Sequence, residues 1–356
     1  MLLQRRTFLA ATLGLFAPLT GLSVKAQEKP KVGFVFLGSV GDHGWNYAHE
    51  RGRRAVAAAL GDLVDITTVE SVAEGRAAEA VMRDLANSDH KLIFATSFDY
   101  MNAAVKVAGE FPEIYFEHVG GFQRTANLAT YNARYYEGRS VTGTIAGHMS
   151  KSGRCGYVAS FPIPEVVRGI NAFTLAARKV NPDFETHVVW MNSWNDPVKE
   201  AQAARELIER KADIISVHVD SPAALQIAEE WDVFTFGQAS DMSAFAPDAH
   251  LSAISNDWST YYISRVQAVL DGTWTTGDSW FGLREGGIGI TPFGKAVSPR
   301  AAAAANRVIS EIKSGSWQVF SGPIHDQTGT LRVARGEVLG DSQLKTVNWF
   351  AEGVKT

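Results

Sequence analysis

The chain has 356 residues, 46% of them hydrophobic, and its 34 basic and 38 acidic side chains give a formal net charge of −4. The sequence contains no run of basic residues, which argues against a protein built to hold nucleic-acid phosphates. Its single cysteine, Cys155, excludes an internal disulfide, and the apolar residues around it predict a small buried side chain.

The first 26 residues have the pattern of an export signal. Arg5 and Arg6 precede an apolar stretch, and small residues before Gln27 predict cleavage after Ala26. General secretory export and twin-arginine export both fit this pattern. No cysteine stands at the cleavage site for a lipid anchor, and no later segment is apolar over the roughly 20 residues of a membrane span. We therefore expect a soluble periplasmic protein, with 31 basic and 38 acidic residues once Arg5, Arg6 and Lys25 are removed.

The mature chain of about 330 residues exceeds what one hydrophobic core usually serves, so we expect two domains. In the first half, short strands rich in Val, Ile and Phe alternate with Ala-rich helical stretches. Strands are expected at 31–38, 64–70, 91–97, 114–120 and 127–133, and helices at 46–60, 73–87, 100–111 and 136–149. This alternation is typical of a parallel sheet covered by helices.

The alternation restarts after Ser150, and Pro197 suits the first turn of one of its helices. Strands are expected at 154–162, 186–193, 212–220, 233–239, 250–255 and 287–291, and helices at 166–180, 198–211, 221–231, 257–270 and 299–315. We assign residues 27–150 and about 257–290 to the first lobe. Residues 151–256 and about 291–356 form the second lobe, and the tail beyond about Gln318 receives no role.

Candidate ligand-binding residues follow the ends of these strands, where ligands lie in open parallel sheets. Trp45 and Trp194 stand in polar loops, unlike Trp190, which lies within an apolar run. We therefore interpret these two indoles as flat faces for a ligand. The other candidates supply rings or hydrogen-bonding groups at strand ends: Asn46, Phe98, Asp99, Phe161, Asp220, Gln238 and Asp241.

The sequence lacks the common motifs of catalysis and metal binding. The glycines of GSVGDHG at 38–44 do not have the spacing of a dinucleotide-binding loop, and no GKS or GKT is present. His49 and Glu50 lack the second histidine of a zinc-protease motif, and no G-x-S-x-G turn occurs. We predict no catalytic residue, no metal site and no cofactor. Asp42 is interpreted as the cap of the helix that starts beside it, with ligand contact as the alternative.

Long blocks of the sequence resemble the basic membrane protein family (Bmp, or PnrA-like) of exported solute-binding proteins that serve ABC importers. The resemblance covers nearly the whole mature chain. It rests on GDHGWN at 41–46, the block NLATYNA to GINAF at 127–173, the block WNDP to KADII at 194–215, FGQASDM at 236–242 and LREGGIGIT at 283–291. It implies a type I periplasmic-binding-protein fold of two α/β lobes with three crossing segments. It also implies a purine ligand in the cleft, as nucleoside or free base.

Two positions depart from the pattern of the nucleoside-binding members. Those members typically have GxDxDQ where this chain has GQASDM, and a lysine in the next strand, so the Asp and Lys that would hold ribose hydroxyls are Ala239 and Asn256 here. A site that binds a ribose by hydrogen bonds to its hydroxyl groups loses much of its affinity when the side chains that make those bonds are missing. The other family positions are kept: Trp45, Asn46, Asp99 and, at the usual Phe, Trp194.

We predict a monomeric, non-enzymatic binding protein that captures a free purine base, such as adenine, guanine or an oxypurine, and delivers it to a membrane permease. Trp45 and Trp194 would face the ring. Edge hydrogen bonds would come from Asn46, Asp99, Asp220, Gln238 and Asp241. Asn256 is a further candidate ligand-binding residue. A binding protein for a purine nucleoside or a sugar-like ligand and an exported nucleoside hydrolase remain alternatives. A regulator of the LacI type shares the fold, but the export signal and the lack of a basic helix-turn-helix oppose it.

Overall fold

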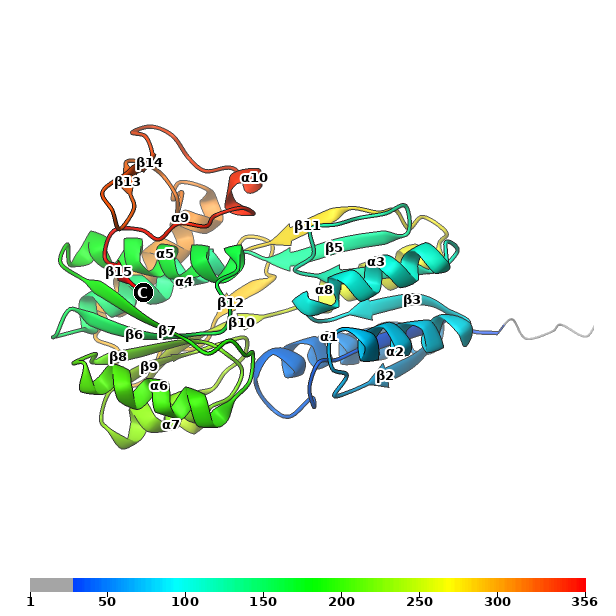
Figure 1. Cartoon of the computed structure of the whole chain (residues 1–356), viewed down its shortest axis with the longest axis horizontal. Coiled ribbons are helices and arrows are strands. Elements are labelled where there is room, and N and C mark those ends of the chain that lie inside the picture. The colour runs from blue at the N-terminus through cyan, green and yellow to red at the C-terminus, as the bar shows by residue number, and fades with distance from the viewer. Residues whose placement is uncertain (1–27) are drawn as a thin grey trace, which may run out of the picture.

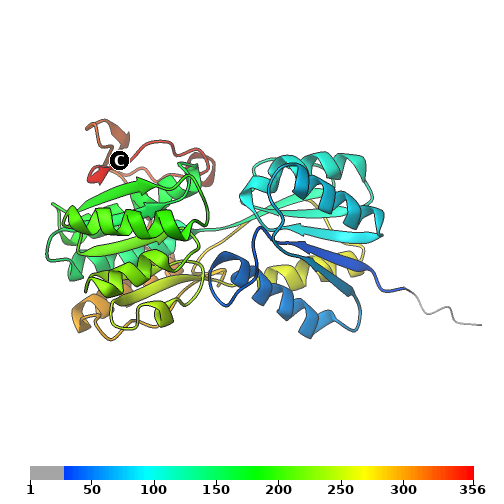
Figure 2. The ribbon, with the colours of Figure 1, turned by 60° about the horizontal axis from the view of Figure 1, so that its bottom comes forward.

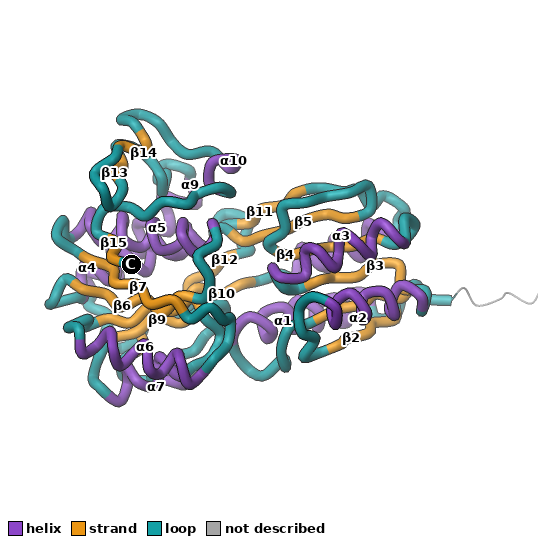
Figure 3. The backbone as a smooth tube through the Cα atoms, viewed as in Figure 1, coloured by secondary structure: helices purple, strands orange, loops and turns teal. Residues whose placement is uncertain are grey.

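The computed structural model describes residues 28–356, so the predicted export signal and its cleavage site lie outside the described residues. Residues 28–356 form two lobes that lie side by side and are joined by segments that pass between them (Figures 1 and 2). Each lobe is a mainly parallel sheet with helices on both faces (Figure 3), which confirms the predicted two-lobed α/β fold. No helix within residues 28–356 combines the length and apolar character needed to cross a membrane.

The first lobe is built on a six-stranded sheet in the order β11-β5-β4-β3-β1-β2, with every neighbouring pair parallel. Its strands are β1 (Lys31–Val35), β2 (Asp65–Val69), β3 (His90–Ala95), β4 (Tyr115–Val119), β5 (Leu128–Ala133) and β11 (Asp278–Phe281). Its helices are α1 (Gly44–Leu60), α2 (Arg76–Asn87), the 3-10 turn η1 (Phe98–Tyr100), α3 (Met101–Glu110) and α8 (Ser259–Leu270). The adjacent residues Phe34 and Val35 point into different cores, one under α1 and α8 and one under α2 and α3.

The second lobe is built on a seven-stranded sheet in the order β12-β10-β9-β8-β6-β7-β15, in which only β12 runs antiparallel. Its strands are β6 (Arg154–Ala159), β7 (Glu185–Trp190), β8 (Ile214–His218), β9 (Phe234–Gly237), β10 (His250–Asn256), β12 (Ile288–Ile290) and β15 (Val354–Lys355). Its helices are α4 (Tyr135–Met149), α5 (Pro164–Val180), α6 (Pro197–Glu209), α7 (Ala223–Glu230), the turn η2 (Ser243–Phe245) and α9 (Pro299–Ser314). Helices α6 and α7 cover one face, while α4, α5 and α9 cover the other.

Three segments connect the lobes, and two of them differ from the expected boundaries. Helix α4 packs along α5 and α9, so the first crossing lies between Ala133 and Tyr135 instead of near residue 150. The second crossing runs from β10 to α8, close to the expected residue 257. The third lies between β11 and β12, because β12 pairs with β10 of the second lobe and does not extend the first to residue 290.

Local signals fix where the helices around the lobe interface begin. Helix α6 begins at Pro197 as predicted, and the carboxylate of Asp196 accepts a hydrogen bond from Lys199 N at 3.1 Å. This cap ends the loop after β7, and Trp194 lies in that loop, three residues before the helix.

Cys155 is fully buried in β6, which confirms its interpretation as a core residue.

Residues 319–356 form a segment that we call the C-terminal strap, which lies over the second lobe (Figure 1). It contains the paired strands β13 (Ile324–His325) and β14 (Leu331–Val333), the helix α10 (Asp341–Leu344) and β15. Strand β15 extends the second sheet beside β7. The side-chain amide of Asn171 on α5 donates to Trp349 O at 2.8 Å, which fixes the strap to the second lobe.

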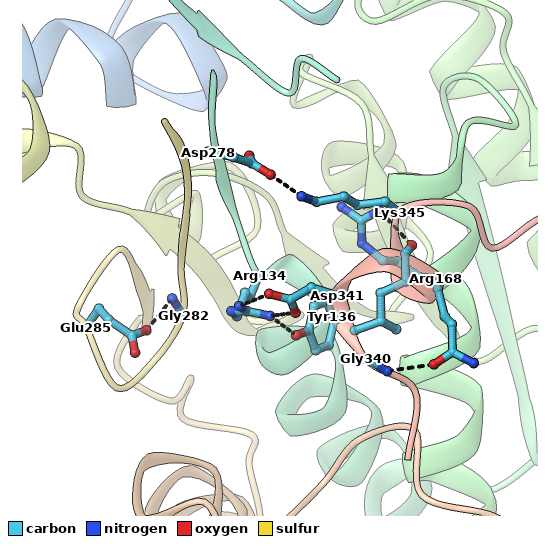
Figure 4. Close-up of polar contacts among 11 residues, drawn as sticks. Arg134, Tyr136, Arg168, Asp278, Gly282, Glu285, Gly340, Asp341 and Lys345 are labelled. Atoms are coloured by element: carbon cyan, nitrogen blue, oxygen red, sulfur yellow. Dashed lines mark hydrogen bonds and ion pairs between the residues drawn. The ribbon is translucent and has the colours of Figure 1, made fainter. Parts of the chain in front are cut away.

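The C-terminal strap also reaches the first lobe where the lobes are joined (Figure 4). Arg134, at the first crossing, donates two hydrogen bonds to Asp341 of α10, at 2.7 and 2.8 Å. Lys345 forms an ion pair with Asp278 on β11 of the first sheet. The Trp280 ring on the same strand lies 4.8 Å from the guanidinium carbon of Arg134. The strap is therefore bonded to both lobes at their junction.

Candidate functional site

A cavity of about 480 Å³ lies between the two lobes, at the carboxyl ends of strands from both sheets. Its first-lobe wall comes from the carboxyl ends of β1, β2, β3 and β4 and the segments that follow them, and its second-lobe wall from those of β6, β7, β8 and β9. A volume of this order falls within the range of about 300–1,000 Å³ that is typical of small-molecule sites. Seven of the ten predicted residues line the cavity: Trp45, Asn46, Phe98, Phe161, Trp194, Asp220 and Gln238.

The two indoles come from opposite lobes, and each is held by a hydrogen bond from its ring nitrogen. Trp45 Nε1 donates to Thr96 O at 2.7 Å, within the first lobe. Trp194 Nε1 donates to Asp99 Oδ2 at 2.6 Å, across the gap between the lobes. Both side chains are half-buried, so each keeps part of its surface toward the cavity. The bond within the first lobe fixes the plane of the Trp45 ring whether the lobes are apart or together, whereas the bond to Asp99 fixes the Trp194 ring where the lobes meet.

Phe98 and Phe161 complete an aromatic wall on either side of the cavity. Phe98 opens the turn η1 after β3, and Phe161 follows β6. The ring of Phe161 lies 5.2 Å from that of Trp194, centroid to centroid, and is tilted by 59°. Both side chains are half-buried instead of forming part of the closed core. Flat apolar surface thus faces the cavity from both lobes.

The polar residues of the cavity are already bonded to the protein on one side. Asn46 Oδ1 accepts from Gly38 N at 3.4 Å, and Gln238 Oε1 accepts from Arg139 Nη2 at 2.5 Å. Since their oxygens are engaged, the amide nitrogens of both side chains are left as donors. Asp220 is bonded across the lobes, as described below.

Three predicted site residues do not line the cavity. Asp99 does not reach the cavity itself, but its carboxylate accepts the hydrogen bond that orients the ring of Trp194. Asp241 is exposed, and its carboxylate accepts a hydrogen bond from Ser243 N, at the start of η2, at 2.9 Å. Asn256 is 1% exposed, and its oxygen accepts from the hydroxyl of Tyr135. Asp99 and Asp241 follow strand ends as predicted, and Asn256 is the last residue of β10, but all three side chains turn to protein partners.

The start of α1 is capped by the opposite lobe. Asp42 was expected to cap this helix, but its carboxylate bonds to His43 at 2.7 Å, and His43 at the cap position makes no side-chain capping bond. The first amides of α1 instead reach the second lobe: Gly44 N donates to Ser240 Oγ at 2.7 Å, and Trp45 N donates to Asp220 Oδ1 at 2.5 Å. The prediction that Asp42 caps α1 is therefore wrong.

Gly44 is required by this contact between the lobes. Its φ is +76°, and a Cβ at this position would lie 2.1 Å from Asp220 Oδ1. Only glycine both adopts this backbone conformation without strain and leaves room for the carboxylate. The glycine-rich loop therefore brings the backbone close to the opposite lobe.

Asp220 sits in an environment that disfavours its charge. Burial raises the pKa of the Asp220 carboxyl group to about 6, although the hydrogen bond from Trp45 N and the nearby His43 act in the opposite direction. The neighbouring acid Glu200 is also buried, and desolvation raises its pKa to about 7. The contact between the lobes thus contains a carboxyl group that titrates in the mildly acidic range.

Several polar residues that line the cavity were not among the predicted contacts: Glu74, Ser97, Glu165, Asn192, Ser193, Asn195 and His218. Asn192, Ser193 and Asn195 flank the predicted Trp194, so the same loop position could have indicated them. Glu165 directly follows Pro164, the first residue of α5, so its place in the first turn of a helix after a strand end was a usable signal. His218 is the last residue of β8. A single histidine in an otherwise apolar strand gave no indication that its side chain would line a cavity.

Comparison with known proteins identifies the family. The model of the Bmp family, described as PnrA-like ABC transporter substrate-binding proteins, matches residues 29–319. A purine-binding protein of Brucella abortus is 47% identical over 334 residues, which cover 94% of this chain and 95% of that protein. A putative ABC transporter glucose-binding protein of Haloferax volcanii is 33% identical over 295 residues, 83% of this chain and 75% of that protein.

Among solved structures, an ABC transporter solute-binding protein from Aeropyrum pernix K1 has the same fold. Its TM-score is 0.70 at 19% identity, with 83% of this chain and 93% of that chain covered. The matched family consists of solute-binding proteins and not of enzymes, which confirms the resemblance seen in the sequence and the prediction of a non-enzymatic role. The chain belongs to the Bmp family of PnrA-like ABC transporter substrate-binding proteins.

Proposed function

We propose that this substrate-binding protein captures a free purine base between its lobes and delivers it to the permease of an ABC importer. The observation that carries the proposal is the pair of indoles, Trp45 and Trp194, which line one cavity from opposite lobes. A flat nitrogen heterocycle stacks on such faces, and each base–aromatic contact contributes roughly 1–3 kcal/mol. The name of the Brucella abortus relative as a purine-binding protein supports the same ligand class.

A free base is favoured over a nucleoside by two positions near the cavity. Ala239 lines the cavity with a methyl group, and the oxygen of Asn256 is occupied by the Tyr135 hydroxyl. Neither position offers a charged partner for ribose hydroxyls, so a sugar placed there would lose hydrogen bonds to water without replacing them. Donors for the edge of a base come from the amides of Asn46 and Gln238.

Capture would proceed by closure of the lobes around the base. A ring in contact with both indoles bridges the lobes and favours the closed arrangement by its differential affinity. Three hydrogen bonds add to this closure: Gly44 N to Ser240, Trp45 N to Asp220, and Trp194 Nε1 to Asp99. The closed protein would then dock on the permease.

The proposal is tested by calorimetric titration of the mature protein with adenine, guanine and hypoxanthine, with adenosine and inosine, and with glucose. We expect at least one free base to bind, and its nucleoside to bind at least about 100-fold more weakly. Tighter binding of a nucleoside than of its base would overturn the choice of a free base. Binding of glucose alone would favour the sugar-binding alternative, which the Haloferax volcanii relative keeps open.

Closure also predicts that affinity depends on pH through Asp220. In separated lobes Asp220 would return to water, where an aspartate titrates near 3.9, whereas burial raises its pKa to about 6 here. Closing therefore takes up a proton. The contribution of Asp220 protonation to closure is fully present below the pKa of the separated lobes. It is lost as the pH rises through the pKa of about 6 in the closed protein. We expect the affinity to fall by about tenfold between pH 5 and pH 7 and to be flat above that.

The Asp220→Asn variant provides the control for this titration. Asparagine keeps an oxygen that can accept from Trp45 N, but it does not titrate. The ratio of wild-type to variant affinity for the same base cancels any titration of the base itself. A ratio that stays constant from pH 5 to pH 7 would show that Asp220 does not take up a proton on closing.

A further inference from the structure

Two buried polar residues face each other in the cavity and have no role in the proposal so far. Glu165 lies in the first turn of α5, and His218 is the last residue of β8. Their side chains are 13% and 6% exposed, and both line the cavity. Glu165 Oε1 lies 3.9 Å from His218 Nε2, which is longer than a hydrogen bond. The two groups are thus neighbours that do not satisfy each other.

His218 is held as a neutral imidazole. Burial lowers its pKa well below the usual value, and the charges of Arg139 and Arg168 act in the same direction. Nδ1 is buried and has no hydrogen-bond partner among residues 28–356. A neutral imidazole has one donor nitrogen and one acceptor nitrogen. Since Nδ1 meets no partner within the described chain, Nε2 is free to carry the proton and act as a donor toward a ligand.

Glu165 has a counter-charge on one side and His218 on the other. Arg168 Nη2 lies 3.7 Å from Glu165 Oε2. Burial raises the pKa of Glu165, while Arg168, a hydrogen bond from Asn132 and the charge of Arg139 act to lower it. The first turn of α5 also favours a negative charge at this position. Glu165 therefore offers a carboxylate oxygen as an acceptor beside the donor Nε2 of His218.

The acceptor of Glu165 and the donor of His218 lie 3.9 Å apart, and such a close pair matches the edge of a free purine base that carries N9–H and N3. The N9–H bond and the lone pair of N3 point in nearly the same direction, whereas N7 and N9–H of the five-membered ring point away from each other. In a nucleoside the glycosidic bond replaces that N–H, so the edge keeps only an acceptor. A carboxylate aimed at this edge accepts from the free base but meets no donor on the nucleoside, and a buried charge left without a partner is costly.

We propose that Glu165 and His218 bind the N3/N9 edge of the purine: Glu165 accepts a hydrogen bond from N9–H, and His218 Nε2 donates one to N3. This inference rests on the proposed function and names the residues that select the base against the nucleoside. The selection works by the loss of a donor, independently of the missing sugar contacts at Ala239.

The test compares adenine with 9-methyladenine and 7-methyladenine, neither of which has an imidazole N–H, on the wild type and on Glu165→Gln. A hydrogen bond to a charged group is stronger than one to a neutral amide. We expect each methyl group to weaken wild-type binding by roughly 100-fold and variant binding by roughly tenfold or less. Glutamine has the same shape, so a penalty caused by crowding would be equal in both proteins. Because each comparison is made within one protein, a general loss of affinity cancels.

Glu74 supplies the matched control, because it is a second carboxylate that lines the same cavity from the first lobe. The Glu74→Gln variant should keep the full penalty for both methyl groups. His218 is tested with 3-deazaadenine, which keeps N9–H but has a C–H group in place of N3. We expect this replacement to weaken wild-type binding by roughly tenfold and to have little effect on His218→Phe.

The outcomes separate the two proposals. If free bases bind, but the methyl penalty is the same in the wild type and in Glu165→Gln, the role of Glu165 is overturned and the proposed function stands. If only one of the two methyl isomers is weakened, crowding explains the result and Glu165 is again excluded. If no free base binds the wild type, both proposals fall. Glu165→Asp, which withdraws the carboxylate by one methylene group, gives a second measurement should Glu165→Gln not fold.

Discussion

Replacing Trp194 by Ala is expected to weaken the binding of a purine base by at least tenfold and by up to roughly 100-fold. The change removes the second-lobe stacking face and the hydrogen bond from Nε1 to Asp99, which joins the lobes at 2.6 Å. The thermal unfolding of the ligand-free protein should change little, because Trp194 is half-buried and lies at the cavity instead of in the core. Calorimetric titration and a thermal melt of the same sample measure both effects.

Two further variants show whether the indole acts on the ligand. Trp231→Ala removes a tryptophan that is 45% exposed and does not line the cavity, so it should bind the base like the wild type. Trp194→Phe keeps an aromatic face but loses the hydrogen bond to Asp99, so its affinity should lie between those of the wild type and Trp194→Ala. Unchanged affinity in Trp194→Ala would make this residue structural and remove the main support of the proposed function.

The largest expected effect on stability belongs to Glu117. Its carboxylate on β4 is fully buried and accepts hydrogen bonds from Tyr261 Oη at 2.6 Å and Trp274 Nε1 at 2.8 Å, and it pairs with Arg265. We expect Glu117→Ala to lower the free energy of unfolding by about 3–5 kcal/mol, because it removes the counter-charge of the partly buried Arg265 and leaves the buried donors of Tyr261 and Trp274 without a partner. Urea unfolding followed by circular dichroism measures this loss.

Glu110→Ala is the matched control, since Glu110 also pairs with an arginine. Its carboxylate lies 2.7 Å from Arg83 Nε, but both side chains are substantially exposed, at 36% and 32%. Water replaces the lost partner there, so the destabilisation should be far smaller than that of Glu117→Ala. Similar losses in the two variants would mean that burial does not set the cost of removing Glu117.

Much of the fold could be predicted because alternating strands and helices have clear sequence signals. Proline and Asp196 mark the start of α6, and apolar runs mark the buried strands. The assignment of α4 could not be predicted in the same way. The residues at 136–149 predict a helix, but which lobe it joins depends on its packing against α5 and α9, which lie farther along the chain.

The candidate site could be predicted as far as strand ends determine it. Trp45, Trp194 and Asp220 follow strands whose carboxyl ends meet at the lobe interface, so their presence in one cavity follows from topology. Asp241 obeys the same rule but turns to the backbone of its own loop. The direction of a side chain within a loop depends on local hydrogen bonds, and these are not evident from the position of the residue. His218 is the last residue of the apolar strand β8, and nothing in that pattern indicates that its side chain faces a cavity.

The C-terminal strap adds non-covalent contacts between the two lobes at the place where they are joined. The family match ends at residue 319, so this segment lies outside the part described by the family model. Its bonds to Arg134 and Asp278 are ion pairs between partly exposed groups: Asp341 is 53% exposed and Lys345 35%. Mobile ions screen such pairs over about 8 Å at physiological concentration. A higher ionic strength is therefore expected to weaken this connection between the lobes, through residues that do not line the cavity.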